Sequence, residues 1–254
     1  MINVLIIGHG IVGKRMEIEL EKFSPDVLDK YKSDENKLSN NTEGYDLAFI
    51  CVNTPFTDES PCDCSEVVNA INENSHLMKD EGIFVIKSTI LPGTTDKIRK
   101  QTGQNVIFSP EYYGETQHCN NFDFDFTILG GEKQDCIKVV QILQKIYDGR
   151  HSFRITDSKT AEIAKYMENA WLATKVSFCS QFFEIAENNG VSYEELRELF
   201  ILDPRVNPSH TFIYRDHPYW DSHCLNKDVP AIAITEDAKF LKSVIEYNSS
   251  RKSK

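Results

Sequence analysis

Short runs of apolar, often β-branched residues alternate with helical patterns along the chain up to about residue 155. The apolar runs include VLII, LAFICV, IFVI and NVIF, and amphipathic patterns such as IVGKRMEIELEKF and KVVQILQKIY lie between them. A short continuous apolar run is typical of a buried strand, and helical periodicity is typical of a helix packed on a sheet. This order predicts an α/β domain with a mostly parallel sheet and helices on both faces.

Strand patterns stop after HSFRITDS, and helical patterns follow. Residues 158–189 are predicted to form one long helix with a broad apolar stripe. A second helix is expected to begin at Ser192, because Glu195 stands three residues further on, which is the spacing of a capping box. The chain therefore divides into a Rossmann-like domain over residues 1–156 and an all-helical domain over residues 157–254.

The rest of the helical domain contains a stretch without periodicity. Residues 203–222, DPRVNPSHTFIYRDHPYWDS, hold three prolines and are predicted to form a long loop, which in compact domains is often functional. A final helix is expected over residues 229–247, followed by a polar, basic tail, NSSRKSK.

Composition narrows the class of protein. The formal charge of −11 disfavours binding to nucleic acid or to an anionic membrane surface. The chain opens without a basic leader, and its apolar runs are shorter than the roughly 20 residues of a membrane span. Seven scattered cysteines fit reduced thiols better than a disulfide framework, so we expect a cytoplasmic protein. A metal site at Cys62, Cys64, His118 and Cys119 is rejected because the spacing is wrong for structural zinc.

A glycine pattern directly follows the first predicted strand and opens a helix. Gly8, Gly10 and Gly13 in GHGIVG match G-x-G-x-x-G, which lets a pyrophosphate approach the helix N-terminus at Ile11 and Val12. Asp29 ends the next strand pattern, PDVLD, where a carboxylate accepts hydrogen bonds from ribose hydroxyls and repels a 2′-phosphate. We therefore expect NAD as the cofactor in preference to NADP.

Five further motifs follow in order: CVNTP at 51–55, KSTILPGTT at 87–95, SPEYYGE at 109–115, AEIAKYMENAWLATK at 161–175 and CLNKD at 224–228. Together they resemble the UDP-glucose/GDP-mannose dehydrogenase family, whose members oxidise the C6 alcohol of a nucleotide sugar to a carboxylate with two NAD. The resemblance implies a homodimer formed through the helical domain.

The resemblance also implies roles for particular residues. Cys224 is the expected nucleophile, supported by the other expected catalytic residues Lys165, Asn169, Asp228, Thr89 and Glu115. Cofactor contacts are expected from Gly8, Gly10, Ile11, Val12, Gly13, Asp29, Val52, Thr54, Thr89, Glu115 and Lys227. Substrate contacts are expected from Glu111, Lys165, Asn169 and Arg205, the last of which reaches a neighbouring subunit in the family.

The chemistry of these residue types agrees with the roles. A thiolate adds to an aldehyde to give a thiohemiacetal, which loses hydride to become a thioester that water hydrolyses. A cation such as Lys227 or His223 next to Cys224 favours the thiolate. Lys165 and Asn169 stand four apart on a predicted helix, so both reach one developing oxyanion.

Simpler interpretations remain open for single residues. Cys224 alone is also compatible with an ordinary packed thiol, Lys165 and Asn169 with a solvated helix face, and Glu111 and Glu115 with surface acids. For the whole chain, two other functions compete with the four-electron dehydrogenase. One is a non-catalytic, dimeric NAD-binding protein, and the other is a two-electron hydroxyacid dehydrogenase that uses Lys165 and Asn169 without the thiol.

The chain departs from the family pattern in three ways. Family members approach the cysteine with a glycine-rich segment, whereas this chain has PYWDSHC, with Tyr219, Trp220 and Asp221. Ser109 stands where asparagine is common. Family members also continue into a second nucleotide-binding domain, while this sequence ends at Lys254, so we expect weak affinity for UDP-glucose, with Tyr214, Tyr219 and Trp220 offering a partial base-stacking surface.

Overall fold

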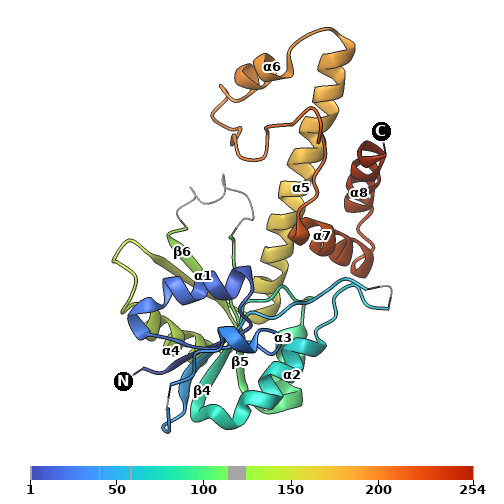
Figure 1. The fold of residues 1–254 in the computed structure, drawn as a ribbon. Coiled ribbons are helices and arrows are strands. Elements are labelled where there is room, and N and C mark those ends of the chain that lie inside the picture. The colour runs from blue at the N-terminus through green and yellow to red at the C-terminus, as the bar shows by residue number, and fades with distance from the viewer. Residues whose placement is uncertain (1, 40, 58, 114–123, 254) are drawn as a thin grey trace. The chain divides into compact units, whose positions relative to one another are not determined.

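A computed structural model describes residues 2–39, 41–57, 59–113 and 124–253. Two compact units divide the chain, the first comprising Met1–Pro55 and Cys62–Lys165 and the second Phe56–Pro61 and Tyr166–Lys254. The first unit contains the strands of the described residues, and Figure 1 shows them crossing it as a twisted sheet. The second unit is helical.

The sheet has seven strands among the described residues, in the order β2-β1-β3-β4-β5-β6-β7. Their bounds are Val4–Ile7 (β1), Asp26–Leu28 (β2), Tyr45–Ile50 (β3), Met78–Ile86 (β4), Asn105–Phe108 (β5), Phe126–Gly130 (β6) and Ser152–Thr156 (β7). Every pairing is parallel except that of β5 with β6. The predicted mostly parallel, Rossmann-like sheet is therefore confirmed.

Helices cover both faces of this sheet because its strands are apolar on both sides. On one face, Leu5, Ala48 and Phe84 pack with residues of α2 and α3. On the other face, alternate strand residues such as Ile6 and Phe49 pack with residues of α1 and α4. The helix bounds are Ile11–Glu19 (α1), Ser65–Asn74 (α2), Thr94–Thr102 (α3) and Lys133–Leu143 (α4), with single 3₁₀ turns at Glu21–Phe23 (η1), Ser33–Glu35 (η2) and Ser75–Leu77 (η3).

The helical part of the chain begins with α5, which spans Ser158–Asn188 and confirms the predicted long helix. At its start Glu162 is fully buried and accepts hydrogen bonds from the backbone N–H groups of Gly93 and Thr95, at the N-terminus of α3. Ser192 caps α6 (Tyr193–Phe200) by accepting a bond from the Glu195 N–H, as predicted. Residues 203–222 form an irregular segment, also as predicted.

The C-terminal helix prediction was wrong in its bounds. Two helices occupy the region, α7 (His223–Thr235) and α8 (Lys239–Lys252), and the chain turns between them where Asp237 has a φ of 48°. Ser222 caps α7 by accepting a bond from the Leu225 N–H, so the helix begins six residues earlier than expected and includes Cys224. Most of the expected polar tail belongs to α8.

Packing in the second unit explains why the tail is helical. Asn248 is buried, and its side chain accepts a bond from the Trp220 N–H at 2.9 Å and donates one to the Trp220 carbonyl at 3.0 Å. Trp220 itself packs with Ala173, Leu225 and Val229, and its indole N–H donates to Ser177. The expected base-stacking role of Trp220 is therefore wrong, because its ring is core.

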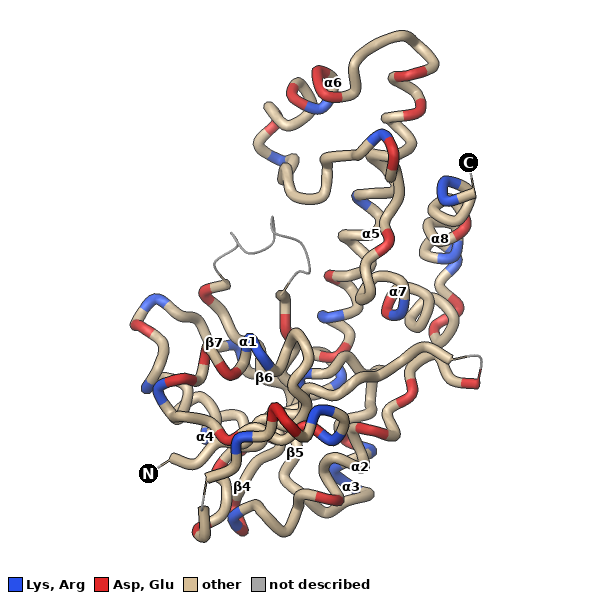
Figure 2. The backbone as a smooth tube through the Cα atoms, in the orientation of Figure 1, with Lys and Arg blue, Asp and Glu red and all other residues tan. Residues whose placement is uncertain are grey.

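Charged residues are interspersed over the backbone of each unit (Figure 2). Within the described residues, no helix has the length and apolar character needed to cross a membrane.

Candidate dinucleotide and dehydrogenase site

The turn after β1 is shaped by its glycines. Gly8 has a φ of +93°, and a Cβ there would lie 2.6 Å from the Cys51 carbonyl oxygen. A Cβ on Gly13 would lie 2.0 Å from the Gly8 carbonyl oxygen, so α1 can pack on β1 only with glycine there. Gly10 is the N-cap residue just before α1, where a Cβ would meet no atom within 4 Å and no side chain caps the helix. The open backbone N-terminus fits the pyrophosphate of a dinucleotide.

Asp29 is buried just beyond β2, and backbone amides surround its carboxylate. One oxygen accepts the His9 N–H at 2.6 Å, and the other accepts the N–H groups of Tyr31 at 2.8 Å and Lys32 at 3.0 Å. Burial acts to raise the pKa of Asp29, but these hydrogen bonds outweigh it and the pKa is lowered. Asp29 is thus held as a carboxylate beside the glycine turn.

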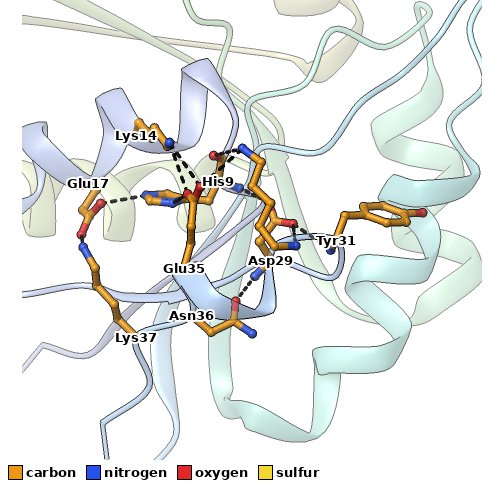
Figure 3. Close-up of polar contacts among 9 residues, drawn as sticks. His9, Lys14, Glu17, Asp29, Tyr31, Glu35, Asn36 and Lys37 are labelled. Atoms are coloured by element: carbon orange, nitrogen blue, oxygen red, sulfur yellow. Dashed lines mark hydrogen bonds and ion pairs between the residues drawn. The ribbon is translucent and has the colours of Figure 1, made fainter.

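Figure 3 shows a charged cluster around His9, the residue between the first two glycines. Its Nδ1 lies 2.5 Å from a Glu35 carboxylate oxygen, and its Nε2 lies 2.8 Å from one of Glu17. Lys32 donates to the His9 carbonyl at 3.1 Å. Backbone and ring of His9 are therefore both anchored, which stiffens the turn. These contacts were not predicted from the sequence, where the only signal of the cluster is the histidine inside the glycine pattern.

The loops after β3 and β4 are joined by two hydroxyl groups. Thr54 donates to the Thr89 carbonyl at 2.7 Å, and Ser88 donates to the Val52 carbonyl at 2.6 Å. The structure therefore brings together three expected cofactor residues, Val52, Thr54 and Thr89, at the carboxyl ends of neighbouring parallel strands. In open α/β sheets this is the edge at which ligands bind.

The segment after β5 carries Glu111, an expected substrate contact, which is buried and accepts a bond from the Tyr113 N–H at 2.7 Å. The buried Lys165 of α5 places its ammonium 5.1 Å from the centre of the Tyr112 ring. A surface location for Glu111 and a solvated face for Lys165 and Asn169 are both excluded, since all three side chains are buried. Glu115 lies outside the described residues.

The second unit holds the residues expected around the thiol. Asp228 is buried, and its two carboxylate oxygens accept bonds from Asn169 at 2.7 Å and from Lys227 at 2.5 Å. Cys224 is half-buried in the first turn of α7, one helical turn before Asp228 on the same face. Asp228 and Lys227 were expected near Cys224 from the resemblance, and the contacts that join Asp228 to Asn169 and Lys227 are visible only in the structure.

Arg205 stands apart from this group. Its guanidinium is largely exposed and pairs with Asp203, with the closest contact at 2.6 Å. Among the described residues, no group of three or more histidine, cysteine, aspartate or glutamate side chains has an arrangement that could hold a metal ion. His118 and Cys119 lie outside the described residues.

Comparison with known proteins defines the class. Residues 11–150 match the NAD binding domain of the UDP-glucose/GDP-mannose dehydrogenase family, and residues 159–250 match its central domain. The chain belongs to the UDP-glucose/GDP-mannose dehydrogenase family, and the cofactor of its first domain is NAD. Both the resemblance and the cofactor expected from the motifs are confirmed.

Individual relatives are nucleotide-sugar dehydrogenases. The chain is 29% identical to a UDP-glucose 6-dehydrogenase of Rickettsia prowazekii, over 86% of this chain and 52% of the relative. It is 28% identical to a UDP-N-acetyl-D-mannosamine dehydrogenase of Methanocaldococcus jannaschii, over 96% of this chain and 60% of the relative. The chain therefore spans little more than half the length of these relatives.

A solved structure shares the fold. The UDP-glucose dehydrogenase of Pyrobaculum islandicum superposes with a TM-score of 0.82 at 20% identity, covering 98% of this chain and 68% of that one.

Proposed function

We propose that the chain oxidises the C6 alcohol of a UDP-glucose-like nucleotide sugar to the carboxylate, with two NAD, through a covalent intermediate on Cys224. The observation that carries this proposal is the pairing of buried Asp228 with Asn169 and Lys227, one helical turn from the thiol. Two donors on one carboxylate orient it rigidly. A smaller apolar residue could fill the same space as this carboxylate, so packing alone does not explain the presence of Asp228.

The first oxidation requires a proton acceptor and a hydride acceptor. NAD, when bound along the glycine turn and the ends of β3 and β4, supplies the hydride acceptor. Lys165 and Asn169 stabilise the oxygen of the alcohol as it becomes the aldehyde, by hydrogen bonding to its growing negative charge. Glu111 positions the sugar.

The second oxidation uses the thiol. The Cys224 thiolate adds to the aldehyde carbon and forms a carbon–sulfur bond, and the resulting thiohemiacetal loses hydride to become a thioester. Water then attacks the thioester, breaks the carbon–sulfur bond and releases the acid and the thiol. The family resemblance implies that Thr89 and Glu115 help to hold this water. For each alcohol, one water and two NAD are consumed, and one carboxylic acid, two NADH and two protons are formed, with the protons released to solvent.

The test is to mix the chain, NAD and a panel of UDP- and GDP-sugars and to follow NADH by absorbance. We expect two NADH per acid with the unmodified chain and no acid with Cys224→Ala. Cys179→Ala is the matched control, because Cys179 is a buried thiol on a different helix, α5. This variant is expected to keep the stoichiometry of two NADH per acid. One NADH per aldehyde, unchanged by Cys224→Ala, would instead support the two-electron hydroxyacid dehydrogenase, and NAD binding without turnover would support the non-catalytic protein.

We also propose that the chain works as a homodimer formed through α5. Within the second unit, Met167 is 74% exposed and Trp171 is 60% exposed, and the apolar stripe continues through Phe178, Phe182 and Ile185. An apolar stripe of this length on one helix is typical of a protein interface. Arg205 is proposed to reach the site of the partner in this dimer. The six cysteines in the described part of the chain are thiols and not disulfides, which supports a proposed reducing, cytoplasmic location.

A further inference from the structure

Two cysteines, Cys62 and Cys64, stand two residues apart in the segment that leads into α2. Their sulfur atoms lie 3.7 Å apart, close enough to share a thiol hydrogen bond. Cys64 is the N-cap residue of α2, and no side chain caps that end of the helix. Both residues belong to the first unit, so their contact lies within one compact part of the chain.

The pair has the geometry of a dithiol that can close into a disulfide. Two Cα atoms separated by one residue lie at most about 7 Å apart, which is near the upper end of the disulfide range. Cys62 is buried and Cys64 is half-buried, so an oxidant in solvent reaches the pair from the side of Cys64. Two small apolar residues would fill the same space, so packing alone does not explain the pair.

Cys62 also contacts the loop after β4. Its thiol donates to the Thr89 carbonyl oxygen at 3.6 Å, and the Thr54 hydroxyl donates to the same oxygen at 2.7 Å. Thr54 and Thr89 are both expected cofactor contacts. A disulfide has no S–H group, so oxidation of Cys62 would remove one of these two donors from the loop.

The thiol of Cys64 is not activated in the resting pair. Its pKa is raised, first by the hydrogen bond with Cys62 and then by burial, and the neighbouring Asp63 carboxylate adds a smaller effect in the same direction. Only a thiolate attacks a disulfide sulfur, so oxidation is expected to be slow at neutral pH. The pair would therefore respond to a sustained change in the thiol–disulfide balance around the protein.

We propose that Cys62 and Cys64 form a reversible dithiol–disulfide site that weakens NAD binding when it is oxidised. The oxidant is a small-molecule disulfide such as glutathione disulfide. One thiolate of the pair attacks a glutathione sulfur, the S–S bond of the oxidant breaks, and a glutathione thiolate leaves and takes up a proton. The second thiol of the pair loses its proton and attacks the mixed disulfide, which forms the bond between Cys62 and Cys64 and releases a second glutathione. Two electrons pass from the protein to the oxidant, and excess glutathione reverses the reaction.

A disulfide closed over a single intervening residue is expected to be labile. Stabilisation by cross-linking grows with the length of the closed loop, so this short loop gains little that would oppose reduction. Strained or exposed disulfides have more oxidising potentials and are the regulatory ones. Disulfides of cytosolic proteins are usually transient or redox-sensing, which agrees with the proposed cytoplasmic location.

The first experiment detects the bond. The full chain is equilibrated in buffers with an increasing ratio of glutathione disulfide to glutathione, and it is then alkylated. Cleavage after glutamate releases residues 60–66, SPCDCSE, which contain both thiols and no other cysteine. We expect this peptide to lose two hydrogen atoms and to take up no alkyl group, and to regain both after treatment with excess glutathione.

Two variants serve as controls for the bond. Cys64→Ser is expected to abolish the intramolecular disulfide. Cys179→Ser, which removes a buried thiol on α5, is expected to leave it unchanged. An unmodified chain whose peptide stays dialkylated after equilibration with glutathione disulfide alone would overturn the proposal.

The second experiment measures NAD binding to the reduced and the oxidised chain by calorimetry. Oxidation is expected to weaken binding about threefold, the effect of losing one weak hydrogen bond in the loop. Cys62→Ser keeps a hydroxyl donor for Thr89 but cannot form the disulfide, so we expect the affinity of the reduced chain in both buffers. Cys62→Ala lacks both the donor and the disulfide, and it is expected to bind NAD as the oxidised chain does in both buffers.

The fold and the reaction are checked separately. If Cys62→Ser does not fold, Cys62→Thr supplies the hydroxyl donor and carries the same test. Equal NAD affinity of the reduced chain and of a chain shown by mass to be oxidised would refute the control of NAD binding. Neither measurement uses a sugar, so the result is independent of the proposed dehydrogenase reaction.

Discussion

The carboxylate of Asp29 holds the backbone of the glycine turn, in addition to the ribose contact expected of it. Asp29 accepts three backbone N–H groups, and one of them belongs to His9 inside the glycine pattern. Substituting Asp29 is therefore expected to change two things at once: the charge at the proposed adenosine ribose site and the shape of the turn. Two predictions at the residue scale separate these effects.

The first prediction concerns cofactor choice. Asp29→Ser is expected to weaken NAD binding about tenfold and to narrow the gap between NAD and NADP, because the carboxylate that repels a 2′-phosphate is gone. Calorimetric titration with NAD and with NADP measures the two affinities. Asp34→Ser, an exposed carboxylate in the nearby 3₁₀ turn η2, is the control and is expected to change neither affinity. Equal affinity of the unmodified chain for NAD and NADP would show that Asp29 does not select the cofactor.

The second prediction concerns pH and stability. The folded-state pKa of Asp29 is lowered, so its contribution to stability is present above the unfolded pKa near 3.9 and is lost as the pH falls through the folded value. Asp29→Asn is expected to cost about 2 kcal/mol at pH 7, since a charged acceptor of three N–H groups is lost. The cost is expected to shrink toward pH 3. Urea unfolding at both pH values tests this, and a cost independent of pH would contradict it.

At the scale of elements, side chains join helix ends to loops. Glu162 on α5 binds the N-terminus of α3, and Asn248 on α8 binds both backbone groups of Trp220. The second link holds the segment that leads into Cys224, because Trp220 stands four residues before the thiol. The aromatic residue that replaces a family glycine pattern is therefore part of the support of α7.

The third prediction tests that support. Asn248→Ala is expected to destabilise the chain by about 2–3 kcal/mol, because it leaves a buried N–H and a buried carbonyl of Trp220 unpaired. Ser249→Ala, on the exposed side of the same helix, is expected to change stability by less than about 0.5 kcal/mol. Thermal unfolding followed by circular dichroism compares them. Equal effects of the two substitutions would show that the Asn248 contacts contribute nothing.

At the scale of the whole molecule, the exposed apolar stripe on α5 favours a protein partner that covers it. The fourth prediction is that Trp171→Glu converts the proposed dimer to a monomer, because a charge would be buried at the interface. Sedimentation velocity measures the mass. Asn72→Glu adds the same charge on an exposed position of α2 and is expected to leave the dimer intact. A monomeric unmodified chain would refute the proposed dimer.

The sequence alone determined the sheet, the long helix and the cofactor, because these depend on local periodicity and on glycines at fixed spacing. Tertiary structure decided what depends on contacts distant in sequence. Trp220 is core because Asn248, 28 residues away, satisfies its backbone. Helix α7 begins at His223 because Ser222 caps it, a local signal that the preceding aromatic loop concealed. Lys87 likewise contacts Ser109 and Pro110, which follow β5 and which the parallel pairing of β4 with β5 places beside it.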